Sequence, residues 1–169
     1  MKRIGSSNED AEPGGTQKPR GLKREQILYV EDEDANWRVA ELRLSNGYDL
    51  RRADSSEAAC RILKQSGGEL SAILMDIELR GSELNGVELA KLIRGKRGEL
   101  EHVPAYARDV PTLATTAIIF VTAYGGKYTD AQLLAAGGDK VIPKPVDFGA
   151  LSVALTQLHL SRAARSKKK

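Results

Sequence analysis

Residues 27–34 read ILYVEDED, a short apolar run that passes directly into four acidic residues. A run of this length, rich in branched side chains, is typical of a strand that is buried on both faces of a parallel sheet. In open sheets of this kind ligands bind at the carboxyl ends of the strands. The acidic residues therefore stand where a parallel sheet places its binding site.

Short apolar runs alternate with amphipathic stretches along the rest of the chain, which predicts a repeating strand–helix pattern. Five strands are expected, at residues 27–30, 48–53, 71–75, 117–121 and 140–142. Five helices are expected between and after them, at residues 35–44, 55–65, 86–94, 129–136 and 148–160. The predicted fold class is α/β, with a doubly wound, five-stranded parallel sheet.

The 169 residues are enough for one domain and too few for two ordinary ones. The domain is expected at residues 25–161, between a disordered polar tail at 1–24 and a basic tail at 162–169. Although the net charge of the whole chain is +3, residues 25–161 hold 15 basic and 20 acidic side chains. Solvated tails are therefore expected and DNA binding is not, with contact between a tail and an acidic partner or nucleic acid as the alternative.

No apolar run approaches the roughly 20 residues that span a bilayer, and the first 16 residues lack the apolar stretch of a signal peptide. A cytoplasmic protein without membrane contacts is expected. The single cysteine, Cys60, lies among alanine, isoleucine and leucine residues and is expected to pack within a helix rather than carry chemistry.

Residues 95–116 fit neither a strand nor a helix, because they include Pro104 and Pro111 and show no sustained periodicity. A connection of this length inside a compact domain is unusual, so it is interpreted as an insertion. It approaches the strand at 117–121 from the amino end, away from the acidic residues. We expect it to belong to an output surface and to be costly to order without a partner. A surface loop without a role is the alternative.

Functional side chains follow four of the expected strands. They are Glu31 and Asp32, Asp76, Thr122 and Lys144. If these strands are neighbours, three carboxylates, a hydroxyl and an ammonium group meet at one rim of the sheet. Clustered carboxylates repel one another unless a cation neutralises them, and Mg²⁺ prefers oxygen ligands of this kind. The set predicts Mg²⁺-dependent transfer of a phosphoryl group onto one carboxylate, with the hydroxyl and ammonium groups contacting the phosphoryl oxygens.

The segments that carry these residues resemble the receiver domains of two-component response regulators, the CheY-like family. They are ILYVEDED at 27–34, ILMDIELRGSELNGVEL at 73–89, IIFVTAYG at 118–125 and VIPKPVDF at 141–148. The resemblance covers about four fifths of the chain and implies the flavodoxin-like strand order 2-1-3-4-5.

The resemblance also implies a role for each residue of the rim. Asp76 is the implied phosphoacceptor, Glu31 and Asp32 form the acidic pair for Mg²⁺, the backbone carbonyl of Glu78 completes the protein ligands, and Thr122 and Lys144 are the switch residues. The loop after Asp76 is slightly longer than usual in the family and lacks its customary proline. Tyr124, two residues after Thr122, either screens the phosphoryl group from water or is an ordinary loop residue.

The partners implied are a sensor histidine kinase or hybrid kinase as the phosphoryl donor and an unknown downstream protein. The expected protein is a stand-alone response regulator that does not turn over external substrates, with a phosphorelay intermediate as the alternative. A haloacid dehalogenase-type phosphohydrolase is a more remote alternative for the function. Asp32 and Asp34 fit its first motif, but no acidic pair follows Lys144. A receiver-shaped module that is never phosphorylated is disfavoured by the complete set of site residues.

Overall fold

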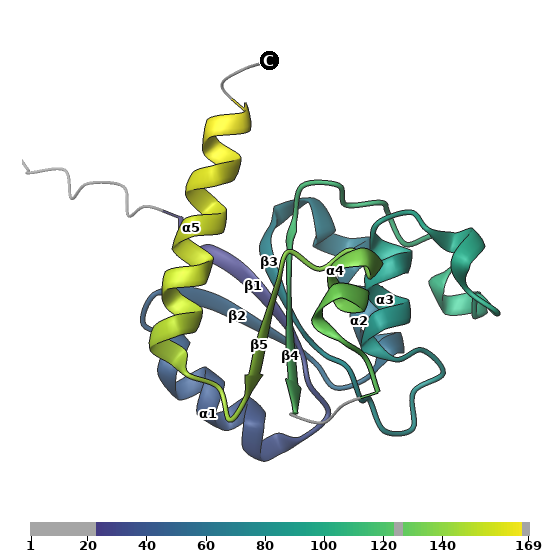
Figure 1. The fold of residues 1–169 in the computed structure, drawn as a ribbon, viewed down its shortest axis with the longest axis horizontal. Helices are drawn as coiled ribbons and strands as arrows, with labels where there is room; N and C mark the ends of the chain where they lie inside the picture. Colours follow the sequence, from purple (N-terminus) through teal and green to yellow (C-terminus); the bar gives the residue numbers. More distant parts are fainter. Residues whose placement is uncertain (1–22, 124–126, 167–169) are drawn as a thin grey trace, which may run out of the picture.

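One parallel sheet forms the centre of the structure, a computed structural model that describes residues 23–123 and 127–166. Its strands are β1 (Glu25–Val30), β2 (Tyr48–Ala53), β3 (Leu70–Asp76), β4 (Ala117–Ala123) and β5 (Lys140–Lys144). Their order across the sheet is β2-β1-β3-β4-β5, and every neighbouring pair is parallel (Figure 1). The predicted fold class and strand order are confirmed.

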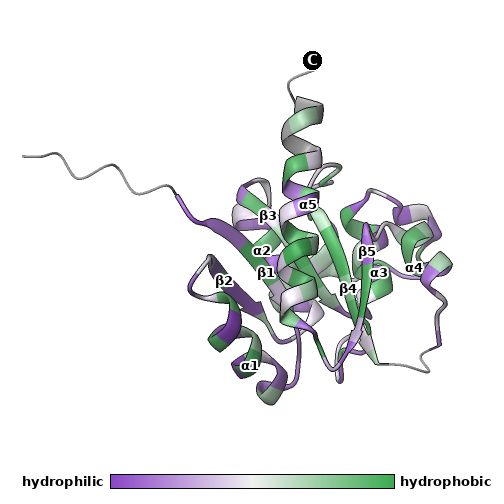
Figure 2. Cartoon of the chain, turned by 60° about the vertical axis from the view of Figure 1, so that its left-hand side comes forward, coloured by the Kyte–Doolittle hydropathy of each residue, from purple (hydrophilic) through white to green (hydrophobic). Residues whose placement is uncertain are grey.

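Helices cover both faces of the sheet. On one face lie α1 (Asp34–Leu44) and α5 (Phe148–Ser166), and on the other lie α2 (Ser56–Ser66), α3 (Gly86–Ile93) and α4 (Asp130–Ala136) (Figure 1). Because side chains alternate along a strand, the two faces bury two separate apolar layers. Ile27 and Tyr29 pack with α1 and α5, whereas Leu28 and Val30 pack with α2 and α3. Hydrophobic colour accordingly concentrates on the central strands in Figure 2.

Side chains cap the starts of α2, α3 and α4. Ser55 accepts a hydrogen bond from the backbone N–H of Ala58 at the start of α2. At the start of α3, Asn85 and Glu88 form a reciprocal capping box. Cys60 is fully buried within α2, which confirms its packing role. None of the helices in the described part of the chain combines the length and apolarity needed to span a membrane.

The last helix is longer than predicted. Apolar periodicity ends near residue 160, yet α5 continues to Ser166, so residues 162–166, expected in the basic tail, are helical. In Figure 1 this end of the helix projects beyond the sheet. Residues 1–22 and 167–169, the rest of the two expected tails, lie outside the described residues.

The insertion at 95–116 packs onto the domain and contains two 3₁₀ turns, η2 (Arg97–Glu99) and η3 (Ala105–Ala107). Ala107, Val110 and Leu113 are buried in the same core layer as α2 and α3. The guanidinium group of Arg97 donates to the carbonyl oxygens of Ala107 (3.1 Å) and Val110 (2.6 Å). The expectation that this segment is costly to order without a partner is therefore wrong, because its apolar side chains are buried within the chain itself.

Candidate functional site

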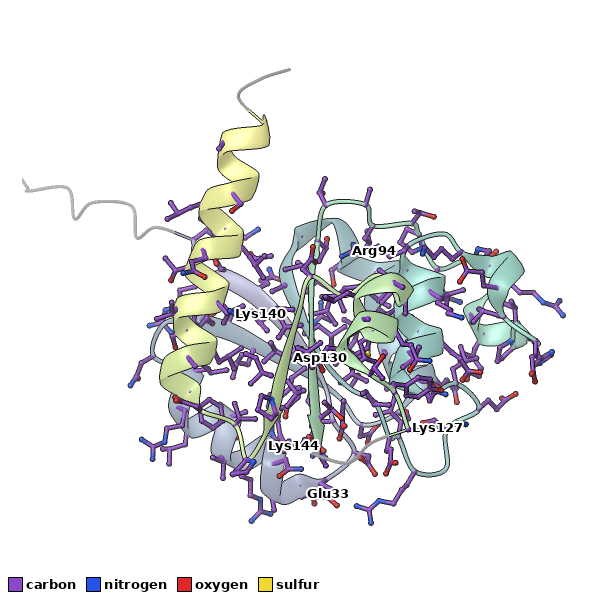
Figure 3. The ribbon with its side chains drawn as sticks, in the orientation of Figure 1. Glu33, Arg94, Lys127, Asp130, Lys140 and Lys144 are labelled. Carbon is purple, nitrogen blue, oxygen red and sulfur yellow. The ribbon has the colours of Figure 1, made fainter. Side chains whose placement is uncertain are left out.

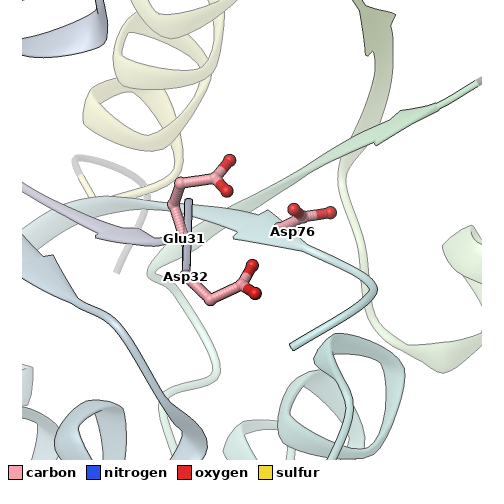
Figure 4. A group of neighbouring side chains, drawn as sticks. All are labelled: Glu31, Asp32 and Asp76. Atoms are coloured by element: carbon pink, nitrogen blue, oxygen red, sulfur yellow. The ribbon is translucent and has the colours of Figure 1, made fainter. Parts of the chain in front are cut away.

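The side chains predicted to share one rim do lie there. Glu31 and Asp32 follow β1, Asp76 ends β3, Thr122 lies in β4 and Lys144 ends β5. Each of the three acidic residues offers a carboxylate oxygen within 4.8 Å of the others (Figure 4). A cleft of about 940 Å³ opens at the rim.

Glu31 is the most deeply buried member of the cluster, with no exposed surface. Its carboxylate accepts hydrogen bonds from the hydroxyl of Tyr29 (3.0 Å), the backbone N–H of Glu33 (3.0 Å) and Nζ of Lys144 (2.9 Å). Burial and the charge of Glu31 raise the pKa of Tyr29, so its hydroxyl stays protonated and donates. Glu31 therefore lies beneath the cleft, whereas Asp32 and Asp76 line it.

Asp76 is held at both carboxylate oxygens. Oδ1 accepts a hydrogen bond from the backbone N–H of Ile77 (2.7 Å), and Oδ2 lies 2.6 Å from Nζ of Lys144. Burial raises the pKa of Asp76 above its ordinary value, and the negative charge of Glu31 adds to this effect, although Lys144 opposes it. The site therefore holds more negative charge than its buried cation balances.

Lys144 is the cation that joins the acidic residues across three strands. Burial alone would lower the pKa of its ammonium group, but hydrogen bonds to Asp76 and Glu31 and their charges raise it overall. The group therefore stays charged between the two carboxylates. Figure 3 shows Lys144 at the same end of the sheet as Glu33. The peptide bond that follows, Lys144–Pro145, is cis.

The other predicted residues are less closely engaged. Thr122 lines the cleft, and its hydroxyl donates to the carbonyl oxygen of Ala123 (3.3 Å). Glu78 is exposed and also lines the cleft. Tyr124 lies outside the described residues.

Gly86 permits the close approach of α3 to the end of β3. A Cβ atom at this position would lie 1.9 Å from the carbonyl oxygen of Asp76, so no other residue fits without moving the backbone. The N–H of Gly86 donates to the carbonyl oxygen of Ile77 (2.9 Å). This contact closes the β3–α3 loop, residues 77–85, beside the cleft.

Two arginines of the site were not predicted from the sequence. Arg52 of β2 donates to the carbonyl oxygens of Glu31 (3.1 Å) and Asp32 (3.0 Å), and its guanidinium lies 5.9 Å from the ring centroid of Trp37. Arg52 thus fixes the backbone that carries the acidic pair. Arg80, in the β3–α3 loop, pairs with the carboxylate of Asp32 (3.0 Å). Neither position has a sequence signal, because each arginine reaches the acidic pair from a distant part of the chain.

The geometry agrees with comparisons to known proteins. The sequence model of the response regulator receiver domain matches residues 27–156. The chain belongs to this family. The matched range spans the insertion and ends within α5.

The relatives support the same assignment. The nitrogen assimilation regulatory protein NtrX of Azorhizobium caulinodans is 29% identical over 147 residues, which cover 84% of this chain. The receiver domain spans only 28% of the length of that relative.

Solved structures share the fold. A putative response regulator from Chloroflexus aurantiacus J-10-fl is similar, with a TM-score of 0.65, 26% identity and coverage of 82% of this chain and 99% of that chain. A CheY-like receiver domain protein from Methanospirillum hungatei JF-1 has a TM-score of 0.66 and 21% identity, over 85% of this chain and 99% of that chain.

Proposed function

We propose that this receiver domain accepts a phosphoryl group on Asp76 in a reaction that requires Mg²⁺, and that it then signals through protein contacts. One observation carries the proposal. The nearly buried carboxylate of Asp76 lines the cleft, 2.6 Å from Nζ of Lys144 and beside Glu31 and Asp32. A carboxylate fixed in this way is oriented for nucleophilic attack on a donor that enters the cleft.

The donor set fits a hard divalent cation. Three carboxylates outnumber the two cations that pair with them, Lys144 and Arg80, and all the candidate ligand atoms are oxygens. Glu31, Asp32 and Asp76, with the backbone carbonyl of Glu78, would hold Mg²⁺. The ion, when bound, neutralises charge between the acidic cluster and an anionic phosphoryl donor.

The residues of the site have distinct roles in the proposed transfer. An oxygen of Asp76 forms a bond to phosphorus while the phosphorus–nitrogen bond of a donor phosphohistidine breaks. The leaving imidazole keeps the bonding electron pair and takes a proton from water. The ammonium group of Lys144 then pairs with one phosphoryl oxygen, and the hydroxyl of Thr122 leaves the carbonyl of Ala123 to donate to another.

A sensor histidine kinase or hybrid kinase is the proposed donor, and an unidentified protein in the cytoplasm is the proposed recipient of the signal. Transfer onward to a second histidine, as in a phosphorelay, remains the alternative fate of the phosphoryl group. We infer no turnover of external phosphomonoesters. The insertion at 95–116 is a candidate contact surface for the recipient, because η2 and η3 do not line the cleft.

The test is labelling with acetyl phosphate and Mg²⁺, read by intact-protein mass spectrometry. We expect one phosphoryl group per chain, and none in Asp76→Asn. Asp32→Asn should weaken Mg²⁺ binding, and the exposed Asp109→Asn in the insertion is the matched control that should label normally. An adduct that persists in Asp76→Asn would show that another residue is the acceptor. Release of phosphate from p-nitrophenyl phosphate over many turnovers would favour the hydrolase.

A further inference from the structure

We propose that Arg80 is a tethered cation that occupies the carboxylate of Asp32 until a divalent ion displaces it, and that Arg80 thereby sets the affinity of the rim for the ion. The inference rests on the proposed function, since it takes Asp32 as a ligand of that ion. It assigns a role to a residue outside the predicted set of site residues.

The contacts of Arg80 converge on the acidic residues after β1. A single oxygen of Asp32, Oδ2, accepts hydrogen bonds from the backbone N–H of Arg80 (3.3 Å) and from its Nε (3.0 Å). The Nη2 atom of the same guanidinium group also pairs with Oε1 of Glu33. Oδ2 of Asp32 is thus already engaged by two donors of Arg80, and an ion that takes this oxygen as a ligand has to compete with them.

The β3–α3 loop is shaped to bring Arg80 back to β1. Gly81 adopts φ of +74°, a left-handed conformation that favours glycine, and the N–H of Ser82 donates to the carbonyl oxygen of Leu79 (3.2 Å). This turn returns the chain toward Asp32, which lies 48 residues earlier in the sequence. Loop geometry and not chance proximity therefore places the arginine at the cleft.

The two cations of the site serve different acids. Lys144 pairs with Glu31 and Asp76, whereas Arg80 pairs with Asp32, and of these five residues only Glu31 does not line the cleft. The side chain of Arg80 is 71% exposed, while that of Asp32 is only 12% exposed. Arg80 therefore shields a nearly buried carboxylate from solvent cations while itself remaining free to leave.

The exposure of Arg80 decides the strength of the effect. An exposed ion pair stabilises little, because solvent screens it and both side chains lose freedom. A divalent ion with several oxygen ligands should therefore displace the guanidinium group, which stays near Glu33. Arg80 should reduce Mg²⁺ affinity by about three- to tenfold rather than block binding.

The experiment measures Mg²⁺ affinity directly, without phosphorylation. Trp37 is the single tryptophan, and its ring lies against Arg52. Arg52 donates to the carbonyl oxygen of Asp32, so the fluorescence of Trp37 should report on ion binding. Mg²⁺ is titrated at constant ionic strength into the full chain and into Arg80→Gln and Arg80→Lys, with calorimetry as a second measurement. Lys127→Gln is the matched control, because Lys127 also lines the cleft but pairs with no acid in the described structure.

We expect Arg80→Gln to bind Mg²⁺ about three- to tenfold more tightly than the parent, Arg80→Lys to fall between them, and Lys127→Gln to change the affinity less than twofold. Mg²⁺ should also speed amide exchange in the peptide that covers residues 77–85 of the parent, because the N–H of Arg80 loses its acceptor. Ion binding to Arg80→Gln but not to the parent would overturn the displacement step, because the parent's ion pair would then block binding.

Equal affinity in Arg80→Gln and the parent would overturn the inference, as would an equal gain in Lys127→Gln, which would indicate a general charge effect. Absence of Mg²⁺ binding in all variants would overturn both the inference and the metal requirement of the proposed function. Tighter binding by Arg80→Gln without any labelling of Asp76 would leave the inference standing and refute the proposed phosphoacceptor.

Discussion

Nζ of Lys144 lies 2.9 Å from Oε2 of Glu31, a carboxylate with no exposed surface. The same nitrogen lies 2.6 Å from Asp76, so one ammonium group joins β5 to the ends of β1 and β3. A buried carboxylate that loses its cation keeps the cost of its desolvation. The ion pairs of Lys144 with Glu31 and Asp76 therefore hold the ends of the three strands together before any ion or phosphoryl group binds.

Lys144→Met should lower the free energy of unfolding by about 3 kcal/mol in metal-free buffer, since it leaves Glu31 buried beside Asp76 without a cation. Urea unfolding measures the change. Lys140→Met is the matched control, because Lys140 is exposed and lies at the other end of β5 (Figure 3), and it should cost about 0.5 kcal/mol or less. Equal losses in the two variants would mean that the buried pair contributes nothing specific.

Asp76→Asn should stabilise the metal-free protein by roughly 1 kcal/mol, which is about 2–4 °C in Tm for a domain of this size. Burial raises the pKa of Asp76 in the folded state above its ordinary 3.8. The folded state then keeps a proton that the unfolded state has lost, so stability falls as pH rises from 3.8 through the raised pKa. Asp76→Asn has no carboxyl group to titrate at this position, so its stability does not undergo this fall with rising pH.

Thermal unfolding of both proteins across this pH range is the measurement for Asp76. The stability advantage of Asp76→Asn should grow as pH rises through the window and then level off at neutral pH. A stability advantage that is constant from acid to neutral pH would contradict the raised pKa of Asp76, because that pKa requires the difference between the two proteins to change with pH.

Thr122→Ala should leave the stability of the unlabelled protein within about 0.5 kcal/mol, because the hydroxyl is part of a long hydrogen bond to the neighbouring carbonyl of Ala123 (3.3 Å). Asp76 should still be labelled by acetyl phosphate, but the labelled variant should lack the change in amide exchange near β4 that labelling produces in the parent. The exposed Thr115→Ala is the control. A normal exchange change in Thr122→Ala would place the coupling at another residue.

Leu113→Ala in the insertion should cost about 2–3 kcal/mol of stability, since Leu113 is 9% exposed and packs into the layer of α2 and α3. Its Cδ1 lies 3.2 Å from the position of a Cβ built on Gly67, which indicates a close fit. Leu42→Ala, at a leucine that is 75% exposed, should change stability by no more than about 0.5 kcal/mol. Similar small effects of both substitutions in urea unfolding would show that the insertion is not part of the core.

The hydroxyl of Tyr106 and Oγ of Ser56 lie 2.7 Å apart and join the insertion to the start of α2. The backbone N–H of Ser56 also donates a hydrogen bond to Oγ of Ser82 in the β3–α3 loop (3.1 Å). The insertion is thus connected by hydrogen bonds to the loop that carries Arg80.

The sequence by itself determined the strands and the residues at their ends. A run such as ILYV at 27–30 has one stable placement, in the middle of a sheet with both faces covered, and the residue that follows a buried parallel strand must lie at the carboxyl rim. The positions of Asp32, Asp76 and Lys144 at one rim follow from local pattern and topology. The starts of α2 and α3, at residues 56 and 86, agree within one residue with the expected starts at 55 and 86.

Only the tertiary structure decided which groups pair at the rim. Arg80 meets Asp32 across 48 residues, Arg52 meets the backbone of Glu31 across 21, and Lys144 meets Asp76 across 68. Such pairings depend on strand order, on the turn at Gly81 and on side-chain direction, none of which leaves a periodic trace in the sequence. The burial of the insertion at 95–116 was likewise decided by the tertiary structure. Its apolar residues are irregularly spaced, because they pack into the core layer of α2 and α3 without following a helix or strand, and only packing shows that they are buried.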